Sequence, residues 1–317
     1  RLPAHTADGM SANDPNARSA GIPLPLAVGR SSLGRFFQSD LGRALLLSQG
    51  IALIWWLAAL WARGGGLPIP VWYDQQRTFS PALFHLADPY AIPGFVCVPW
   101  TAPLLAPFSL LPLPLAVLAQ LCVYFAALTG IVFKFGGGVR SVLLALTSFI
   151  AFDSALELNI DWLVCLGLLV PPAWSGPLLL VKPQDAMGYW LSLDGRDLRR
   201  AVLVTLAALL ASLVLWGFWP ESMAAAIRTW TLGRAYNLAP SALLPWPLAW
   251  GTGVVLGVLA RRRRDPVLGV LAWLFFVPYI TLYSLLLPFT LATARWPRAA
   301  AVISAAMWLI YGGVLVW

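Results

Sequence analysis

Residues 44–62 read ALLLSQGIALIWWLAALWA, and this stretch decides the fold class. It carries no charge and is long enough for an α-helix to cross the hydrocarbon core of a bilayer. A second stretch, VWYD at residues 71–74, follows shortly after it and ends in an aspartate. A carboxylate at a membrane boundary is costly unless it is paired, solvated or used. Asp74 is therefore the residue around which a functional interpretation can be built.

The composition of the whole chain also indicates a membrane protein. Of 317 residues, 60% are hydrophobic and 11% are charged, whereas soluble domains carry about 25% charged residues. Seven further runs have no charge: 89–133, 141–152, 162–181, 201–220, 235–260, 267–294 and 299–317. These runs are too long for barrel strands. We therefore expect an all-α, polytopic transmembrane protein with roughly eight to ten membrane segments, some short or re-entrant.

The distribution of basic residues predicts the orientation and the domains. Residues 1–43 read as a polar, Pro-, Gly- and Ser-rich tail, and its arginines before the first span predict a cytoplasmic N-terminus. Residues 44–317 then form the transmembrane domain, with an outer loop at about 63–98. We expect residues 1–40 to lie against the protein's own loops or a partner protein, and the protein to reside in a bacterial plasma membrane.

The net charge of +8 comes mostly from arginines between apolar runs, which favours orientation in the membrane over binding of nucleic acid. The run RRRR at residues 261–264 is the strongest marker of a cytoplasmic side. We interpret it as a cytoplasmic anchor, and binding of anionic lipid is the alternative.

The sequence allows more specific predictions for several segments. Residues 115–133 and 201–219 predict proper spans, and residues 223–231 predict an amphipathic surface helix. Residues 141–152 are short for a span and lead to Asp153, Glu157 and Asp161, which we expect on the outer side. Residues 267–294 predict a hairpin broken near Pro278 or Pro288.

The chain lacks the usual signatures of soluble catalysis. It contains no Walker motif, no HExxH and no CxxC, and its two histidines and three scattered cysteines do not predict a metal site. No cofactor is expected, and any substrate must be reached from the membrane or the outer aqueous side. In a partly dry site Asp74 can accept a proton from an attacking hydroxyl group. The alternative is an ordinary exposed aspartate in a loop.

Other polar residues near membrane boundaries are weaker candidates. Arg77 could bind an anion or pair with Asp74, and His85 could transfer a proton or cap a loop. Asp88 and Tyr90 flank Pro89 in a turn signal. Lys182 follows an apolar run, so it is either a partner for phosphate or a snorkelling lysine.

The order of these residues resembles a known family. VWYD at 71–74 is followed by DPY at 88–90 and by the Pro-punctuated run VPWTAP at 98–103. NID at 159–161, KPQ at 182–184 and a weaker echo at Tyr279 and Tyr283 come later. This ordered set resembles the GT-C membrane glycosyltransferases, specifically the polyprenyl-phosphate-mannose-dependent group, glycosyltransferase family 87 or DUF2029.

The resemblance implies a GT-C-like fold and a metal-independent, inverting transfer of a mannose-like sugar from a polyprenyl-phosphate donor to an extracytoplasmic acceptor. Asp74 would be the catalytic base. The substrate-binding candidates are Arg77, His85, Asp88, Tyr90, Lys182, Gln184, Arg228 and Arg234. Membrane lipids and the lipid-linked sugar would be the partners.

Two readings of other classes remain open. The short chain and its 17 tryptophans also suit a non-catalytic subunit or scaffold of a larger membrane complex. A transporter or flippase would require polar residues in mid-span, of which the sequence has few. If the protein is an enzyme, Asp74 and at least one basic candidate should line one cavity.

Overall fold

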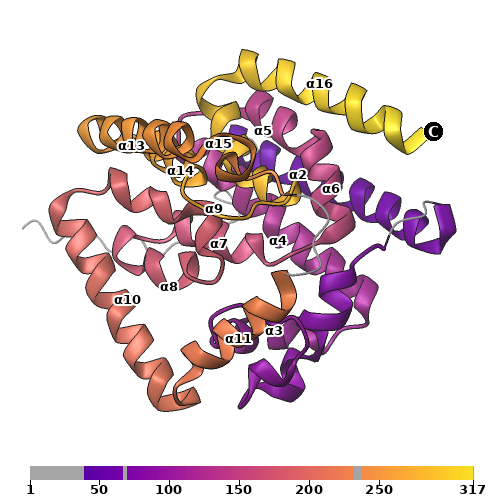
Figure 1. Ribbon diagram of the computed structural model, residues 1–317. Coiled ribbons are helices and arrows are strands. Elements are labelled where there is room, and N and C mark those ends of the chain that lie inside the picture. Colours follow the sequence, from indigo (N-terminus) through magenta and orange to yellow (C-terminus); the bar gives the residue numbers. More distant parts are fainter. Residues whose placement is uncertain (1–38, 67–69, 232–236, 317) are drawn as a thin grey trace, which may run out of the picture.

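The computed structural model describes residues 39–66, 70–231 and 237–316, and within these ranges it contains helices, turns and loops but no strand (Figure 1). The all-α prediction is therefore confirmed for this part of the chain. Of the predicted tail, only residues 39–43 are described. The first described helix, α2 (Asp40–Trp61), begins inside the predicted tail because the Ser39 hydroxyl accepts the Gly42 N–H at 3.1 Å and caps the helix.

Six longer helices form the frame of the molecule. They are α2, α4 (Leu113–Lys134), α10 (Gly195–Trp216), α11 (Trp219–Thr231), α13 (Trp246–Arg263) and α16 (Pro297–Val316). The helix of residues Asp40–Gly65, which is α2 and its continuation, and helices α4 and α10 are long and apolar enough to cross a membrane. Helices α5 (Val139–Leu146) and α6 (Phe149–Glu157) together would make a fourth span, bent by 56°.

The prediction of eight to ten membrane segments is thus higher than the three or four candidate spans among the described residues. The physical reason is proline. The apolar run 162–181 is divided at Pro171 and Pro172 into α7 (Asp161–Leu169), η5 (Pro172–Trp174) and α8 (Ser175–Leu179). The run 267–294 is likewise divided around Pro278 into α14 (Pro266–Leu274) and α15 (Leu286–Arg295), as the predicted hairpin requires.

The remaining elements are short. They are α3 (Thr101–Ser109), α9 (Pro183–Ala186), α12 (Pro240–Leu243), η1 (Ala62–Gly66), η2 (Gln75–Phe79), η3 (Ser80–His85), η4 (Pro89–Ala91), η6 (Met187–Ser192) and η7 (Tyr283–Leu285). Three of them, η2 to η4, form the predicted outer loop at 63–98, which contains Asp74. Because the chain changes direction between such short elements, side chains from several of them can point into one cavity.

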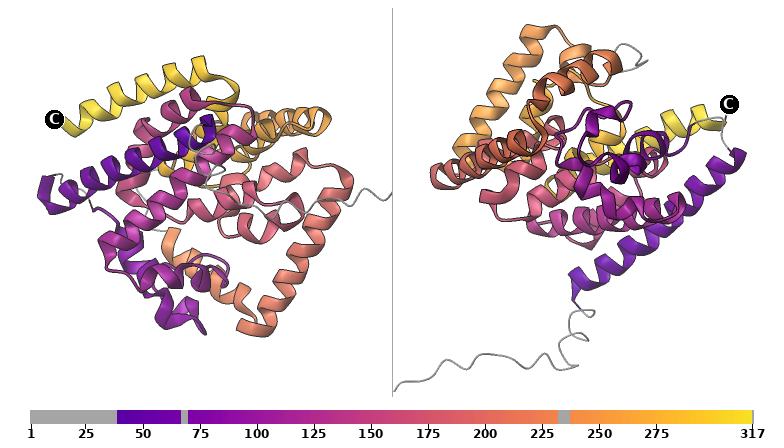
Figure 2. Two further views of the ribbon diagram at one scale, coloured as in Figure 1. Left: turned by 180° about the vertical axis from the view of Figure 1, so that it is seen from behind. Right: turned by 90° about the horizontal axis from the view of Figure 1, so that it is seen from below.

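Helix α4 is the centre of the packing. Of its most apolar stretch, 61% is buried, against 22% for α2 and 17% for α10. Helices α2 and α7 pack on α4, and α5 and α15 also contact it. Seen from behind, α2 crosses the back of the molecule (Figure 2).

Two of the candidate spans expose apolar side chains along much of their length. Helix α2 exposes Leu46, Leu47, Leu53, Ile54, Leu57, Leu60 and Trp61, and α10 exposes Val202, Leu203, Leu206, Leu210, Val214 and Leu215. Exposed apolar surfaces of this size on a soluble protein would be an aggregation hazard. Lipid is the solvent that suits these faces, which agrees with the composition of the chain.

Candidate functional site

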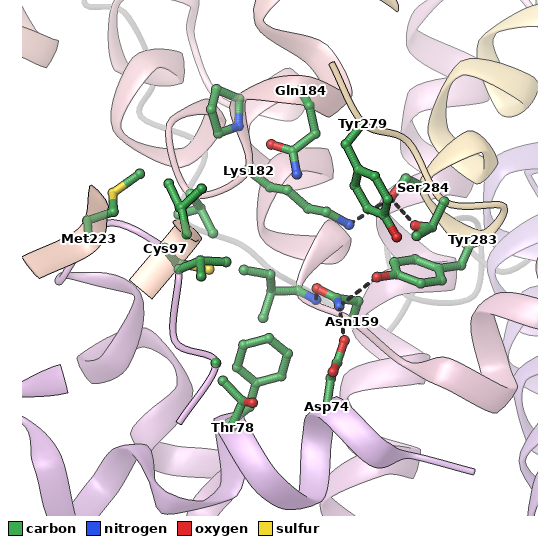
Figure 3. A pocket seen from close by; sticks show the side chains of 18 of the residues that line it. Asp74, Thr78, Cys97, Asn159, Lys182, Gln184, Met223, Tyr279, Tyr283 and Ser284 are labelled. Carbon is green, nitrogen blue, oxygen red and sulfur yellow. Dashed lines mark hydrogen bonds between the residues drawn. The ribbon is translucent and has the colours of Figure 1, made fainter. Parts of the chain in front are cut away.

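A cavity of about 240 Å³ lies between the loop after α2, the start of α7, the segment before α9, α11 and the coil that precedes η7 (Figure 3). Its polar lining is formed by Asp74, Thr78, Cys97, Asn159, Lys182, Gln184, Tyr279, Thr281, Tyr283 and Ser284. The other lining side chains are apolar. Asp74 and Lys182, which lie 108 positions apart in the sequence, therefore meet in one cavity.

The position of Asp74 is determined by Trp72, two residues before it. Trp72 adopts a left-handed backbone conformation with φ of 59° and is completely buried. Its N–H donates to the Leu156 carbonyl at 2.8 Å, and its indole Nε1 donates to the Ala155 carbonyl at 3.0 Å. Both carbonyls belong to the last turn of α6, where a helix has no partners of its own. Trp72 thus joins the Asp74 loop to the end of α6.

The end of α6 also presents Asn159, the partner of Asp74. Leu158 caps the helix with φ of 34°, and the chain then turns toward the cavity. The Asn159 Nδ2 donates to Asp74 Oδ2 at 2.8 Å and to the Tyr283 hydroxyl at 3.1 Å. Its Oδ1 accepts the Ile160 N–H at 2.8 Å, which orients the amide. Two non-glycine residues in the left-handed region on either side of this contact are the kind of backbone strain found at functional sites.

Replacement of Trp72 by Phe should lower the free energy of unfolding by about 1–3 kcal/mol, because the Ala155 carbonyl loses its buried partner. The loss can be measured by thermal unfolding of the detergent-solubilised protein, followed by tryptophan fluorescence. Trp174→Phe is the matched control, since Trp174 is 63% exposed. Equal stability of the two variants would show that the Trp72 indole does not hold the loop.

Lys182 is the centre of a buried group of charges. Its ammonium lies 2.7 Å from Asp161 Oδ1 and 3.7 Å from Asp185 Oδ2. It also donates to the Ser284 hydroxyl at 2.8 Å and lies 4.6 Å from the centre of the Tyr283 ring. All three charged residues are buried. Asp161 is buried with Lys182 as its charge partner, and its position on the outer side of the membrane stays a prediction.

The surroundings give the two carboxyl groups, Asp161 and Asp185, different pKa values. Burial, and after it the charge of Asp161, raise the pKa of Asp185 well above its usual range. Burial alone would also raise the pKa of Asp161, but the charge of Lys182 and hydrogen bonds hold it below the ordinary value. The pKa of Lys182 is raised, because the two carboxyl groups outweigh the effect of its burial. These pKa directions favour a proton on Asp185, while Lys182 and Asp161 form the close ion pair.

Asp185→Asn tests this assignment. A carboxyl group with a raised pKa stabilises the fold below about pH 4, its ordinary value, and this contribution is lost as the pH rises through the raised value. Because asparagine resembles the protonated acid, the variant should stay within about 1 kcal/mol of the wild type at pH 5. It should become relatively more stable at pH 8. A constant loss of several kcal/mol between pH 5 and 8 would instead show that Asp185 is ionised.

Of the other site residues predicted from the sequence, some line the cavity and some do not. Gln184 lines the cavity together with Asp74 and Lys182. Arg77 is exposed, donates to the Tyr73 hydroxyl at 3.0 Å and does not line the cavity. The Tyr90 hydroxyl donates to the Cys97 carbonyl at 2.9 Å. Tyr90 therefore contacts a residue that lines the cavity but does not line it itself.

Of the other candidates, the three that are described do not line the cavity. His85 is half-buried, Asp88 is exposed, and neither lines the cavity. Arg228 is exposed on α11 next to Ile227, which does line it. Arg234 lies outside the described residues.

Four residues that complete the arrangement were given no site role from the sequence: Asn159, Asp161 and Tyr283, which were noted only in the family resemblance, and Asp185. A signal for two of them was present, since Asp185 stands three residues after Lys182 and Asn159 stands two residues before Asp161. A polar residue beside an apolar run needs a partner when it is buried. The sequence did not show which residues would be buried together.

A scan of the chain against protein-family models found no match, and searches of curated proteins and of solved structures found none either.

Proposed function

We propose that this protein is a membrane glycosyltransferase of the GT-C type, in which Asp74 is the general base. The observation that carries the proposal is the position of the Asp74 carboxylate, held by Asn159 in the wall of a largely apolar cavity. This carboxylate faces the space in which a substrate would bind. It can accept a proton while the cavity excludes most of the solvent.

The proposed step is a single displacement. The acceptor oxygen attacks the anomeric carbon of the sugar and gives its proton to Asp74. The bond from that carbon to the phosphate oxygen breaks with its electron pair, and polyprenyl phosphate leaves. This in-line step inverts the sugar and requires a base, a site for the phosphate and a cavity that excludes water. The mannose-like sugar and the polyprenyl carrier come from the family resemblance.

The apolar part of the cavity supports a lipid-linked donor. Met223 and Ile227, one turn apart on α11, both line it. On the same proposal, the arginine that meets the donor phosphate is Arg228, which lies on α11 beside the cavity without lining it. Gln184 would donate its amide to the same group. Because Asp161 already compensates Lys182, the lysine shapes the wall more than it attracts the phosphate.

The placement in a bacterial plasma membrane with a cytoplasmic N-terminus is part of the same proposal. It is supported by the exposed apolar faces of α2 and α10. It would put the Asp74 loop on the outer side, where lipid-linked sugars serve as donors for extracytoplasmic acceptors.

The test is sugar transfer by the full chain in purified membranes, with a radiolabelled mannosyl polyprenyl phosphate as donor and extraction of the labelled acceptor. Transfer that depends on the expressed chain and is lost in Asp74→Asn would support the proposal. Transfer of the same size in membranes with a folded Asp74→Asn variant would rule out Asp74 as the base. A water-soluble nucleotide sugar serves as the negative control for the donor.

A second candidate is a non-catalytic subunit of a larger membrane complex. It is favoured by one observation: the only cationic residue among the described residues that line the cavity is Lys182, which is already paired with Asp161. A scaffold would show no transfer with any polyprenyl-phosphate sugar and would co-purify with the same partner proteins at a fixed ratio. These two results together would replace the first proposal.

A further inference from the structure

One end of the molecule gathers two groups of arginines that are distant in the sequence. Arg196, Arg199 and Arg200 lie at the start of α10, and residues 261–264, all arginine, lie at the end of α13. The Arg261 guanidinium donates to the Leu193 carbonyl, just before α10. The seven arginine side chains are exposed. Because one contact links both groups, they form a single surface, which we call the basic end.

A close backbone contact holds the basic end together. The helical turn η6, which leads into α10, packs on α14, which follows α13. At the crossing, a Cβ atom on Gly188 would lie only 2.1 Å from the Gly269 carbonyl oxygen, and one on Gly269 would lie 2.4 Å from the Gly188 oxygen. Only glycine permits this approach at either position. The start of α10 is therefore held beside the turn between α13 and α14.

Two of the three acidic residues at the basic end, Asp194 and Asp265, cap helices. Asp194 caps α10 by accepting the Asp197 N–H at 2.8 Å. Asp265 caps α14 by accepting the N–H groups of Val267 at 3.0 Å and Leu268 at 3.2 Å. The pKa of Asp194 lies below its ordinary value, chiefly because of the bond from Asp197, with Arg264 and Arg196 adding to the effect.

The positive charge of the basic end is not neutralised internally. Seven arginines stand against three aspartates, which leaves a net charge of +4. Within residues 39–66, 70–231 and 237–316, the ion pairs found all involve Lys182, so none of these arginines forms one. The surface is thus open to an anionic partner.

Helix stability does not account for the arginines of α10. The N-terminus of a helix carries a partial positive charge, so cations in the first turns are unfavourable there. Arg196, Arg199 and Arg200 all lie in the first two turns. The arginines at the end of α13 do suit their helix terminus. Two explanations remain for the arginines of α10: orientation in the membrane, as predicted from the sequence, and a bound anion.

The apolar side chains that continue from the basic end indicate the class of partner. On α10, Leu203 and Leu206 are exposed at about 5 and 9 Å along the axis from Arg200. On α13, Val258 and Val255 are exposed at about 8 and 12 Å from Arg263. The polar layer of a leaflet is about 5–8 Å thick. On each helix taken by itself, exposed arginines are followed by an exposed apolar face, which is the order of headgroup and acyl chains in a leaflet.

We propose that the basic end binds the headgroups of anionic phospholipids in the adjoining leaflet. Each guanidinium presents several N–H donors in a plane, which suits two oxygens of one phosphate. The partner is a lipid rather than a soluble polyanion because the apolar faces of α10 and α13 adjoin the arginines. This inference does not depend on the proposed transferase activity.

The experiment is a titration of the detergent-solubilised full chain with dioctanoylphosphatidylglycerol, with dioctanoylphosphatidylcholine as the neutral comparison. The test variant combines Arg199→Gln, Arg200→Gln and Arg263→Gln. The matched control combines Arg140→Gln, Arg295→Gln and Arg298→Gln, which removes the same charge from three exposed arginines at other helix ends. Unchanged thermal unfolding of both variants shows that they are folded.

Each arginine near a membrane surface contributes roughly a fivefold change in affinity, so the test variant should bind the anionic lipid on the order of a hundredfold more weakly. The control should change by less than about threefold, and wild-type binding should weaken with added salt. Equal weakening of both variants, or equal binding of the neutral lipid, would overturn the proposal. So would equally tight binding of glycerol 3-phosphate or of a single-stranded oligonucleotide, because either would show that the acyl chains do not matter.

Discussion

Asp74→Asn should lower the rate of sugar transfer by about 10²- to 10⁴-fold, which is the usual contribution of a general base. Asparagine keeps the shape of the side chain and can still meet Asn159, but it cannot accept the proton of the acceptor hydroxyl. The loss should therefore appear in kcat, while KM for the donor stays within about threefold. The measurement is initial rates at several donor concentrations with purified protein in lipid.

The neighbours of Asp74 give this prediction its controls. Asn159→Ala removes the donor that holds Asp74 Oδ2, so we expect a smaller loss, of about tenfold, through misplacement of the carboxylate. Glu221→Gln, which changes an exposed carboxylate at the start of α11 outside the cavity lining, should leave the rate unchanged. A folded Asp74→Asn variant with wild-type kcat would exclude general-base catalysis by this residue.

Lys182→Met should lower the free energy of unfolding by about 3–5 kcal/mol. The methionine fills a similar volume, so packing is largely kept, but Asp161 loses the charge that permits its burial. Ser284 and Tyr283 also lose their contacts with the ammonium, so η7 loses an attachment to the cavity wall. Thermal unfolding and the yield of monodisperse protein in detergent both report this effect.

The second carboxyl group allows a sharper version of the same test. Lys182→Met combined with Asp161→Asn removes both charges, so the double variant should regain at least half of the stability lost in the single variant. Asp185 is already neutral in the proposed arrangement and needs no further change. A single variant as stable as the wild type, or a double variant that loses the sum of both effects, would show that the lysine and Asp161 are not coupled.

The helical class and the main spans were predictable because they depend on local features. An uncharged run such as residues 44–62 satisfies its own backbone hydrogen bonds as a helix wherever it lies. For this reason α2, α4 and α10 appear close to their predicted positions. Fewer candidate spans than predicted lie among the described residues, in part because prolines divide apolar runs, as Pro171 and Pro172 do in 162–181.

The candidate site was predictable only in part. The sequence by itself determined the helical class, the apolar runs and two polar residues, Asp74 and Lys182, whose positions beside such runs are costly without a partner. Only the tertiary structure decided that Asn159 holds Asp74 across 85 positions and that Asp161 neutralises Lys182 across 21. The physical reason is that a helix is stabilised between residues a few positions apart, whereas the partner of a buried charge is whichever side chain the packing brings within hydrogen-bond distance.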